Sequence, residues 1–318
     1  MRVGCAPAIV LVAMCGVVAT EAADPLSFFR PDVTTTESDR RQLDRGEPIA
    51  HPLAAHDREV AVWAAVPVAI GPDRLVAWIE QIAKLKKSEY VPAIHRFSTP
   101  PAIADLAELA LDPDDLDAIA SCPPGDCDLK LTPDEITALR NEPVSARQGA
   151  FRSIVLARVT RYLAGGGSAD GSRRVLQHSP FLVAGAPDLV TQLVEPPRIA
   201  SDSHAFVYWS KERIANRSIV IVTDVRVVRS DEPSRPLVLV VGKEIFWTRY
   251  LSAGLGVTAL VRGSTPASNY LVYVNRSEVD AVHGWLGGII RWAIQHRLAA
   301  DAADVLRGLR TRLESGEP

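Results

Sequence analysis

Residues 271–297, LVYVNRSEVDAVHGWLGGIIRWAIQHR, contain the change of pattern that decides the fold. The stretch up to residue 279 is rich in valine, leucine and tyrosine and predicts a β-strand. After a glycine-rich segment, apolar residues recur at helical spacing up to residue 314, which predicts a long amphipathic helix that packs back onto a sheet. The predicted apolar face of this helix consists of Leu286, Ile290, Ala293, Leu298, Ala302, Val305, Leu309 and Leu313.

Four more strand-like runs precede this stretch, at residues 204–214, 217–229, 235–250 and 254–263. The segments between successive runs are short, so we expect neighbouring strands to be antiparallel. Further upstream, residues 48–53 and 58–68 predict a hairpin of two strands. Gly71-Pro72-Asp73 then begins a helix with proline in its first turn.

Residues 92–197 differ in composition, being rich in alanine, leucine and aspartate, and predict several short helices. The order of elements is therefore two strands, helices, five antiparallel strands and one long helix, which predicts an α+β fold. A curved antiparallel sheet of about seven strands has one apolar face to bury, and we expect the terminal helix to cover that face.

This order of elements resembles that of the START and polyketide-cyclase superfamily (SRPBCC, Bet v 1-like), and within it the stretch 271–297 resembles secreted bacterial members. The resemblance covers residues 46–314 and consists of element order rather than a residue motif. It implies a single helix-grip domain in which residues 92–197 are a helical insertion. Residues 23–45 are then an irregular leader and residues 315–318 a short tail.

The first 22 residues have the layout of a secretory signal peptide. Arg2 precedes an apolar core at residues 8–18, and Thr20 and Ala22 stand where small residues mark a cleavage site. The apolar run is short for a bilayer span, although an N-terminal anchor and a buried helix are the alternatives. No later stretch predicts a transmembrane helix. We therefore expect a secreted or periplasmic protein.

Removal of that peptide would leave two cysteines, Cys122 and Cys127, around a Pro-Pro-Gly turn. In an oxidising compartment this pair predicts a disulfide, because Pro124 and Gly125 favour the chain reversal that brings the cysteines together. A redox-active pair normally has two intervening residues rather than four, and a structural zinc site needs four ligands. We interpret the pair as a structural staple.

Several other functions are disfavoured by the sequence. A formal net charge of −3 argues against a general nucleic-acid-binding protein, and the chain contains no Gly-x-Ser-x-Gly, His-Glu-x-x-His or Walker motif. Residues 254–259 match the letters of a dinucleotide fingerprint, but a strand pattern follows them, so we expect a bend or bulge there. The aspartates of residues 112–117 are expected to cap a helix rather than bind a cation. No cofactor or metal is predicted.

Polar residues inside otherwise apolar strands are the remaining candidates for a site. On a sheet curved around a cavity, a few charges among aromatic side chains can orient a mostly apolar ligand. The alternative is that the charged residues lie on a solvated face or form cross-strand ion pairs, because the sequence does not reveal which phase faces the helix. The predicted ligand-binding residues are Tyr208, Asp224, Arg226, Glu244, Trp247 and Tyr273.

The resemblance implies a binding or carrier role more readily than catalysis. The leading hypothesis is a secreted protein that holds a hydrophobic small molecule or lipid between its sheet and its last helix, with no catalytic residue assigned. The first alternative is a cyclase, hydratase or isomerase on the same fold, with Asp224, Glu244 or Tyr273 as acid or base. The second is a structural or interaction protein of the cell envelope, with the helical insertion as its docking surface.

Overall fold

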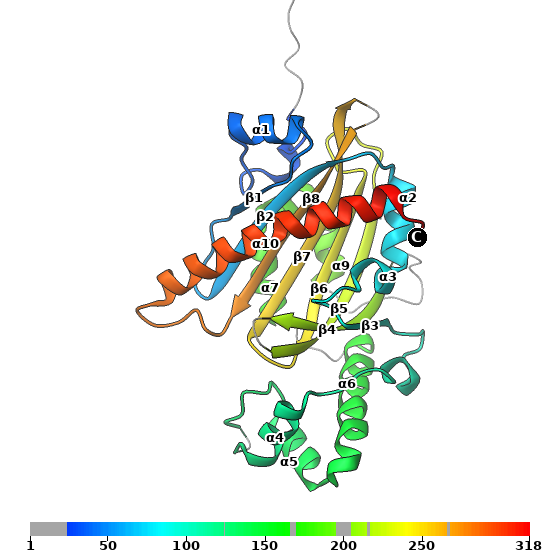
Figure 1. Ribbon diagram of the computed structural model, residues 1–318, viewed down its shortest axis with the longest axis vertical. Coiled ribbons are helices and arrows are strands. Elements are labelled where there is room, and N and C mark those ends of the chain that lie inside the picture. The colour runs from blue at the N-terminus through cyan, green and yellow to red at the C-terminus, as the bar shows by residue number, and fades with distance from the viewer. Residues whose placement is uncertain (1–23, 124, 166–169, 195–204, 215–216, 266–267) are drawn as a thin grey trace, which may run out of the picture.

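The computed structural model describes residues 24–318 except 124, 166–169, 195–204, 215–216 and 266–267 (Figure 1). The predicted signal peptide lies outside the described residues. Within them, eight strands form one antiparallel sheet in the order β1-β2-β8-β7-β6-β5-β4-β3. The strands are β1 (Ile49–Pro52), β2 (Glu59–Val68), β3 (Ala93–Arg96), β4 (Ala205–Ile214), β5 (Arg217–Arg229), β6 (Val238–Trp247), β7 (Leu251–Thr265) and β8 (Ser268–Val279).

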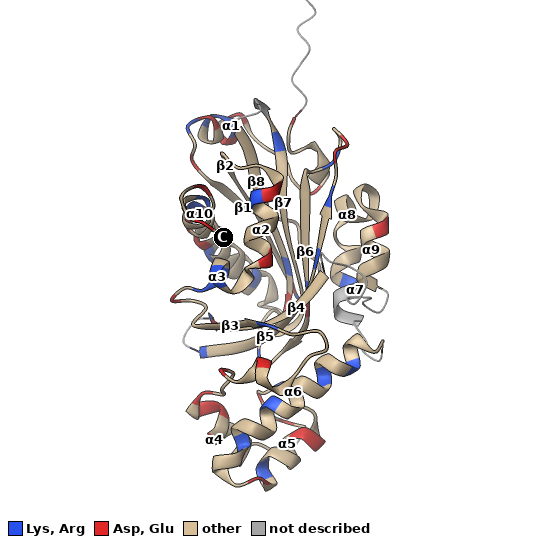
Figure 2. Cartoon of the chain, turned by 90° about the vertical axis from the view of Figure 1, so that its right-hand side faces the viewer, with Lys and Arg blue, Asp and Glu red and all other residues tan. Residues whose placement is uncertain are grey.

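Helices lie on both faces of this sheet, as the side view in Figure 2 shows. The face under the C-terminal helix is termed the grip face, and it is covered by α2 (Pro72–Glu80), α3 (Ile82–Lys86) and α10 (Gly287–Ser315). The opposite face, termed the back face, is covered by η1 (Ser27–Phe29), α7 (Asp170–Gln177), α8 (Pro180–Gly185) and α9 (Pro187–Val194). The short helix α1 (Glu37–Asp44) packs beside β1 and β2.

The α+β class and the helix-grip arrangement predicted from the sequence are confirmed. The helix α10 packs against β1, β2 and α2, and its Leu306 and Leu313 join the core of the grip face. The expectation of a single buried face was incomplete, because helices also bury the back face. Residues 60–66 of β2 are all buried and apolar, because a strand covered on both faces forms a continuous apolar run rather than an alternating one.

The buried side of α10 differs from the predicted one. Leu286 and Val305 of the predicted apolar face are exposed. The side-chain amide of Gln295 instead fills the contact with the first hairpin, donating to the carbonyl oxygens of Leu53 (2.8 Å) and Ala61 (2.7 Å). Of the predicted face, Leu313 is buried and Ala302 and Leu309 pack against the core, so apart from Val305 the periodicity was correct for the second half of the helix only. The buried residues of the helix are Gly287, Gln295, Ala299, Leu306 and Leu313.

Residues Ala93–Arg96, within the segment interpreted as an insertion, form β3 and belong to the sheet. The helices between β3 and β4 form two groups: α7 to α9 cover the back face, and the others extend beyond the end of the sheet (Figures 1 and 2). This second group, termed the helical unit, consists of η2 (Ile103–Leu106), α4 (Pro113–Ser121), α5 (Pro133–Asn141), η3 (Val144–Ala146) and α6 (Arg147–Leu163).

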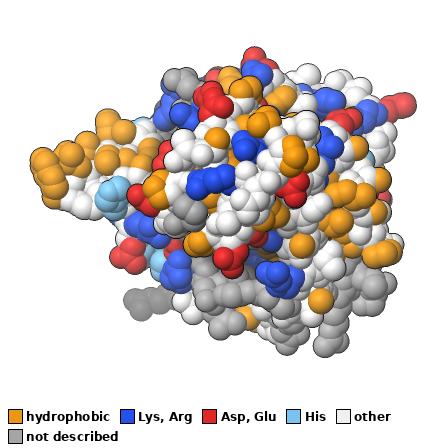
Figure 3. Space-filling view, turned by 90° about the horizontal axis from the view of Figure 1, so that it is seen from below, with side chains coloured by type: hydrophobic (Ala, Val, Ile, Leu, Met, Phe, Trp, Pro, Cys, Tyr) orange, Lys and Arg blue, Asp and Glu red, His pale blue; other side chains and the backbone are white. Residues whose placement is uncertain are grey.

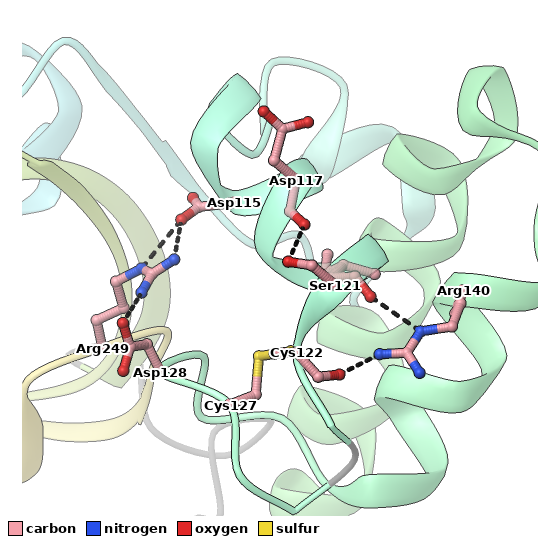
Figure 4. The surroundings of a disulfide bond; sticks show 9 residues. Asp115, Asp117, Ser121, Cys122, Cys127, Asp128, Arg140 and Arg249 are labelled. Carbon is pink, nitrogen blue, oxygen red and sulfur yellow. Dashed lines mark hydrogen bonds and ion pairs between the residues drawn. A yellow bond between two sulfur atoms is a disulfide. The ribbon is translucent and has the colours of Figure 1, made fainter.

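A disulfide and a buried ion pair stabilise the helical unit (Figure 4). The predicted disulfide between Cys122 and Cys127 is confirmed, with 5.2 Å between the two Cα atoms. Gly125 has a φ of +93°, as expected for the turn, whereas Pro124 lies outside the described residues. The buried guanidinium of Arg249 donates to Asp115 Oδ1 from Nε (3.0 Å) and Nη2 (2.7 Å), which joins α4 to the β6–β7 turn. The disulfide therefore supports local structure.

Candidate functional site

Glycines leave the middle of the grip face almost without side chains. Gly242 of β6 is paired with Gly256 of β7, and Gly254 lies on the same face two residues before Gly256. The intervening Lys243 and Leu255 point to the back face, where both are buried. The backbone on the grip side is therefore incompletely covered. The grip-face positions that remain partly accessible here, termed the floor, are Gly242, Gly256, Thr258, Tyr273 and Asn275.

Glu244 is the acidic group next to the floor. Its carboxylate lies against Gly254 of the neighbouring strand, where the Cβ of any other residue would collide with it. The indole Nε1–H of Trp247 donates to Glu244 Oε2. Burial raises the pKa of Glu244 to about 7; the Trp247 hydrogen bond acts in the opposite direction, and the nearby Glu212 carboxylate raises the pKa further. This group therefore exchanges a proton readily near neutral pH.

A lysine–glutamate pair interacts electrostatically with Glu244. Lys86, the last residue of α3, donates to Glu212 Oε1 (3.0 Å) and to the Tyr208 hydroxyl (3.1 Å), and the Ser210 hydroxyl donates to the same Glu212 oxygen (2.7 Å). Burial alone would lower the pKa of Lys86, but the Glu212 carboxylate and Tyr208 raise it well above its usual value. The side chains of Lys86 and Glu212 stay 34% and 24% exposed, so they form an ionised pair at the margin of the floor.

Tyr273 of β8 brings a phenol to the same region. Burial raises its pKa to about 12, and this pKa also responds to the charges of Lys86, Glu244 and Glu212. The phenol therefore stays protonated at neutral pH and can donate a hydrogen bond. An acid, a cation, a second carboxylate and a phenol thus converge from four elements, α3, β4, β6 and β8.

The strand register divides the predicted ligand-binding residues between the two faces. Consecutive residues of a strand point to opposite faces, and β5 pairs Thr223 with Glu244 and Asp224 with Lys243. Glu244 therefore faces the grip side, whereas Asp224 faces the back. Four of the six predicted residues belong to the region around the floor, namely Tyr208, Glu244, Trp247 and Tyr273; the structure places Asp224 and Arg226 on the back face.

Asp224 belongs to a buried polar network that joins the back face to the insertion. The hydroxyl of Tyr162 in α6 donates to Asp224 Oδ2 (2.6 Å), and the Arg226 guanidinium donates to the same oxygen (3.2 Å). The Lys243 ammonium lies over the Tyr162 ring and donates to the Leu193 carbonyl of α9 (2.6 Å). Burial raises the pKa of Asp224 and lowers the pKa of Lys243 to about 8. These contacts explain why charged residues stand inside apolar strands without facing the floor.

Sequence reasoning missed Lys86, Glu212 and the glycines of the floor. Lys86 ends a short helix and Glu212 lies near the end of a strand, where charged residues are common, so neither carries a local signal. The spacing of Gly254 and Gly256 was such a signal. Both lie in the regular part of β7, and the two register shifts of that strand lie outside residues 254–259, between Leu251 and Ala253 and between Val261 and Thr265. Alternate glycines in a central strand mark a face on which space is needed.

Metal-binding side chains do not gather among the described residues: no group of three or more His, Cys, Asp or Glu is placed to hold a metal ion. In the described part of the chain, every helix is too short or too polar to span a bilayer.

No protein-family model matches the chain, and no curated protein matches it. Among solved structures, a protein of Thermus thermophilus matches 36% of this chain and 70% of its own length, with 12% identity and a TM-score of 0.28. A START superfamily protein from Mycobacterium smegmatis matches 34% of this chain, which spans 64% of that protein, with 16% identity and a TM-score of 0.25. The di-domain ARO/CYC StfQ from the steffimycin biosynthetic pathway matches 84% of this chain and 86% of its own length, with 12% identity and a TM-score of 0.27. The strand order and the packing of α10 against β1 and β2 by themselves give the helix-grip arrangement.

Proposed function

We propose that this protein binds a mostly apolar small molecule, such as a lipid, between the grip face and α10. The observation that carries the proposal is the floor itself. It stays partly accessible, whereas the opposite side of the same strands is filled with buried side chains. Protein interiors are normally packed to high density, so bare backbone beneath a covering helix supports space for a ligand.

The surroundings of the floor indicate the chemistry of that ligand. Apolar side chains border it toward the C-terminal end of α10, and the polar group around Glu244 borders it at the other end of β6. Lys86 and Glu212 already neutralise each other, so a buried ligand charge would lack a partner there. We therefore favour an apolar body with one neutral hydrogen-bonding group. The apolar border consists of Val238, Val240, Leu260, Leu271, Leu306 and Leu313.

Native mass spectrometry of the purified protein tests the proposal, with Gly256→Leu as the blocking variant. The nearest atom to a Cβ at Gly256 is Tyr273 Cε2 at 4.0 Å, so the backbone accepts a side chain that then occupies the floor. We expect the wild type to carry an apolar adduct that Gly256→Leu loses. Gly149→Leu is the matched control, because nothing lies within 4 Å of an added Cβ in α6, and it should retain the adduct.

Two results would contradict ligand binding on the grip face. One is a wild type that carries no adduct and does not bind a lipophilic fluorophore. The other is equal binding of that fluorophore by the wild type and a folded Gly256→Leu variant, with folding checked by circular dichroism.

Acid–base catalysis at the same place is a second candidate function. A general acid or base works best with a pKa near the working pH, and the pKa of Glu244 is about 7. In a cyclase, hydratase or isomerase, Glu244 would move a proton while the Tyr273 phenol donates a hydrogen bond to an oxygen of the substrate. If the wild-type adduct is a product, Glu244→Gln should carry a precursor of equal mass, or one that differs by water. Chromatographically identical adducts on both proteins would contradict catalysis but leave binding intact.

The proposed location is outside the cytoplasm, in the periplasm of a cell with two membranes. The signal-peptide pattern and the Cys122–Cys127 disulfide support this location. Amino-terminal sequencing of the protein from a periplasmic extract should find a chain that begins after Ala22. A full-length chain that stays in the cytosolic fraction would contradict it.

A further inference from the structure

The turn before α10 and the first turns of that helix carry apolar side chains that nothing in the described chain covers. Trp285 is 92% exposed, Ile289 66% and Trp292 62%, and Leu286 is exposed as well. Ile289 and Trp292 are three residues apart on one side of the helix, and Trp285 and Leu286 lie in the turn that leads into it. This part of the molecule projects beyond the edge of the sheet at the left of Figure 1, and the same projection in Figure 3 is covered with hydrophobic side chains. These four residues are termed the α10 stripe.

Basic side chains lie within the α10 stripe, and acidic ones lie at its two ends. Residues 281–300 contain Arg291 and Arg297 but no aspartate or glutamate, and Asp280 and Asp301 flank this segment. The side chain of Arg297 is 81% exposed, and its Nε pairs with Asp301 Oδ2 (3.1 Å). The imidazole of the exposed His296 stacks on Trp292 with 4.3 Å between ring centroids. The projection is therefore aromatic, with basic side chains among the aromatic ones.

We propose that the α10 stripe docks the protein on the surface of an anionic lipid bilayer. Tryptophan side chains favour the boundary between water and hydrocarbon, and an amphipathic helix with basic side chains adds attraction to anionic headgroups. The inference goes beyond the proposed function, because it does not require a ligand on the grip face. Docking would hold the molecule at the membrane through a helix that lies on the surface and does not span it.

A second copy of the chain fits this surface less well. A two-fold contact through the stripe would bring Arg291 and Arg297 of one copy toward those of the other, and the nearby Asp301 is already paired with Arg297. The stripe is also only about 12 Å long, which is small for a stable interface of about 800 Å² per partner. The small area argues against a second copy, and the arginines within the stripe favour an anionic surface.

Co-sedimentation with vesicles tests the inference on the mature chain. We expect binding to mixed phosphatidylcholine–phosphatidylglycerol vesicles, weak binding to phosphatidylcholine alone, and a loss of affinity at high salt. Trp285→Ser combined with Trp292→Ser should weaken binding about tenfold or more, and Arg297→Glu by about tenfold. The matched control replaces two exposed apolar residues elsewhere, Tyr90→Ser with Val144→Ser, and should bind as the wild type does.

Three results would overturn the inference. The first is a wild type that does not bind either kind of vesicle. The second is unchanged binding by the double-serine variant, which would place the contact elsewhere. The third is a wild type that does not bind vesicles but forms a dimer in analytical ultracentrifugation, together with a double-serine variant that stays monomeric. That result would assign the stripe to a contact with a second copy of the chain.

Discussion

The carboxylate of Glu244 on β6 lies against Gly254 of the neighbouring strand β7, in space that any larger residue would fill. Gly254 is not among the glycines with a positive φ, so the space that the carboxylate occupies, and not the backbone conformation, is what a larger residue would disturb. The position of the Glu244 carboxylate beside the floor therefore depends on the residue at position 254 of the neighbouring strand.

Replacing this glycine should release the acid. In Gly254→Ala, we expect the Glu244 carboxylate to leave β7 and lose its bond from Trp247. The pKa of Glu244 should then fall from about 7 toward its ordinary 4.5, because the side chain regains solvent. Infrared titration of the isotope-labelled carboxylate measures this change. Gly149→Ala is the control, since its added Cβ meets nothing within 4 Å. A pKa that stays at about 7 in Gly254→Ala would contradict the dependence.

Glu244 should also make stability depend on pH. Because the pKa of Glu244 is raised in the folded protein, the folded state keeps a proton between about pH 4.5 and 7 that the unfolded chain releases. The stability from this group is therefore complete below pH 4.5 and is lost as the pH rises through 7. Relative to the wild type, Glu244→Gln should gain about 1–3 kcal/mol of unfolding free energy between about pH 5 and pH 8. Urea unfolding at the two pH values measures this difference, and parallel pH profiles would refute it.

The polar network around Asp224 on the back face should stabilise the folded protein and should not take part in ligand binding. Asp224→Ala would leave the Arg226 guanidinium buried without its carboxylate and should cost about 3–5 kcal/mol of unfolding free energy. Tyr162→Phe removes one hydrogen bond and should cost about 1–2 kcal/mol while leaving grip-face binding unchanged. Denaturant unfolding and fluorophore binding measure the two effects. The opposite result would be an Asp224→Asn variant that is as stable as the wild type but no longer binds the fluorophore. It would show that Asp224 contacts the ligand.

The disulfide should add only a small amount to the free energy of unfolding, and its removal should affect only the helical unit. Only four residues separate Cys122 from Cys127, so Cys122→Ser with Cys127→Ser should cost about 2 kcal/mol or less. The cysteines lie in the helical unit and not on the grip face, so binding of the lipophilic fluorophore should not change. Urea unfolding of the variant, and of the wild type with and without reductant, measures the loss. A loss of fluorophore binding in the folded variant would indicate that the helical unit also shapes the grip face.

Much of the fold could be predicted because its signals are local. The strand runs, the helix starts and the cysteine pair depend on residues close together in the chain, and each appears in the structure at nearly the predicted place. The strand β3 was missed because four residues are too few to show a period. The apolar face of α10 was predicted correctly only in its second half, because Gln295 in the first half is buried and donates to two backbone carbonyls that lie far away in sequence.

The sequence alone determined the order of elements, the α+β class and the staple, since propensity and turn chemistry act over a few residues. Only the tertiary structure decided which phase of each strand faces α10. With helices on both sides, both phases of a strand such as β2 are apolar, so alternation cannot distinguish them. The same packing places Lys86 beside Glu212, which is 126 residues away in the sequence, and directs the side chain of Asp224 to the back face. These contacts join residues that are distant in the sequence, so a local sequence pattern does not predict them.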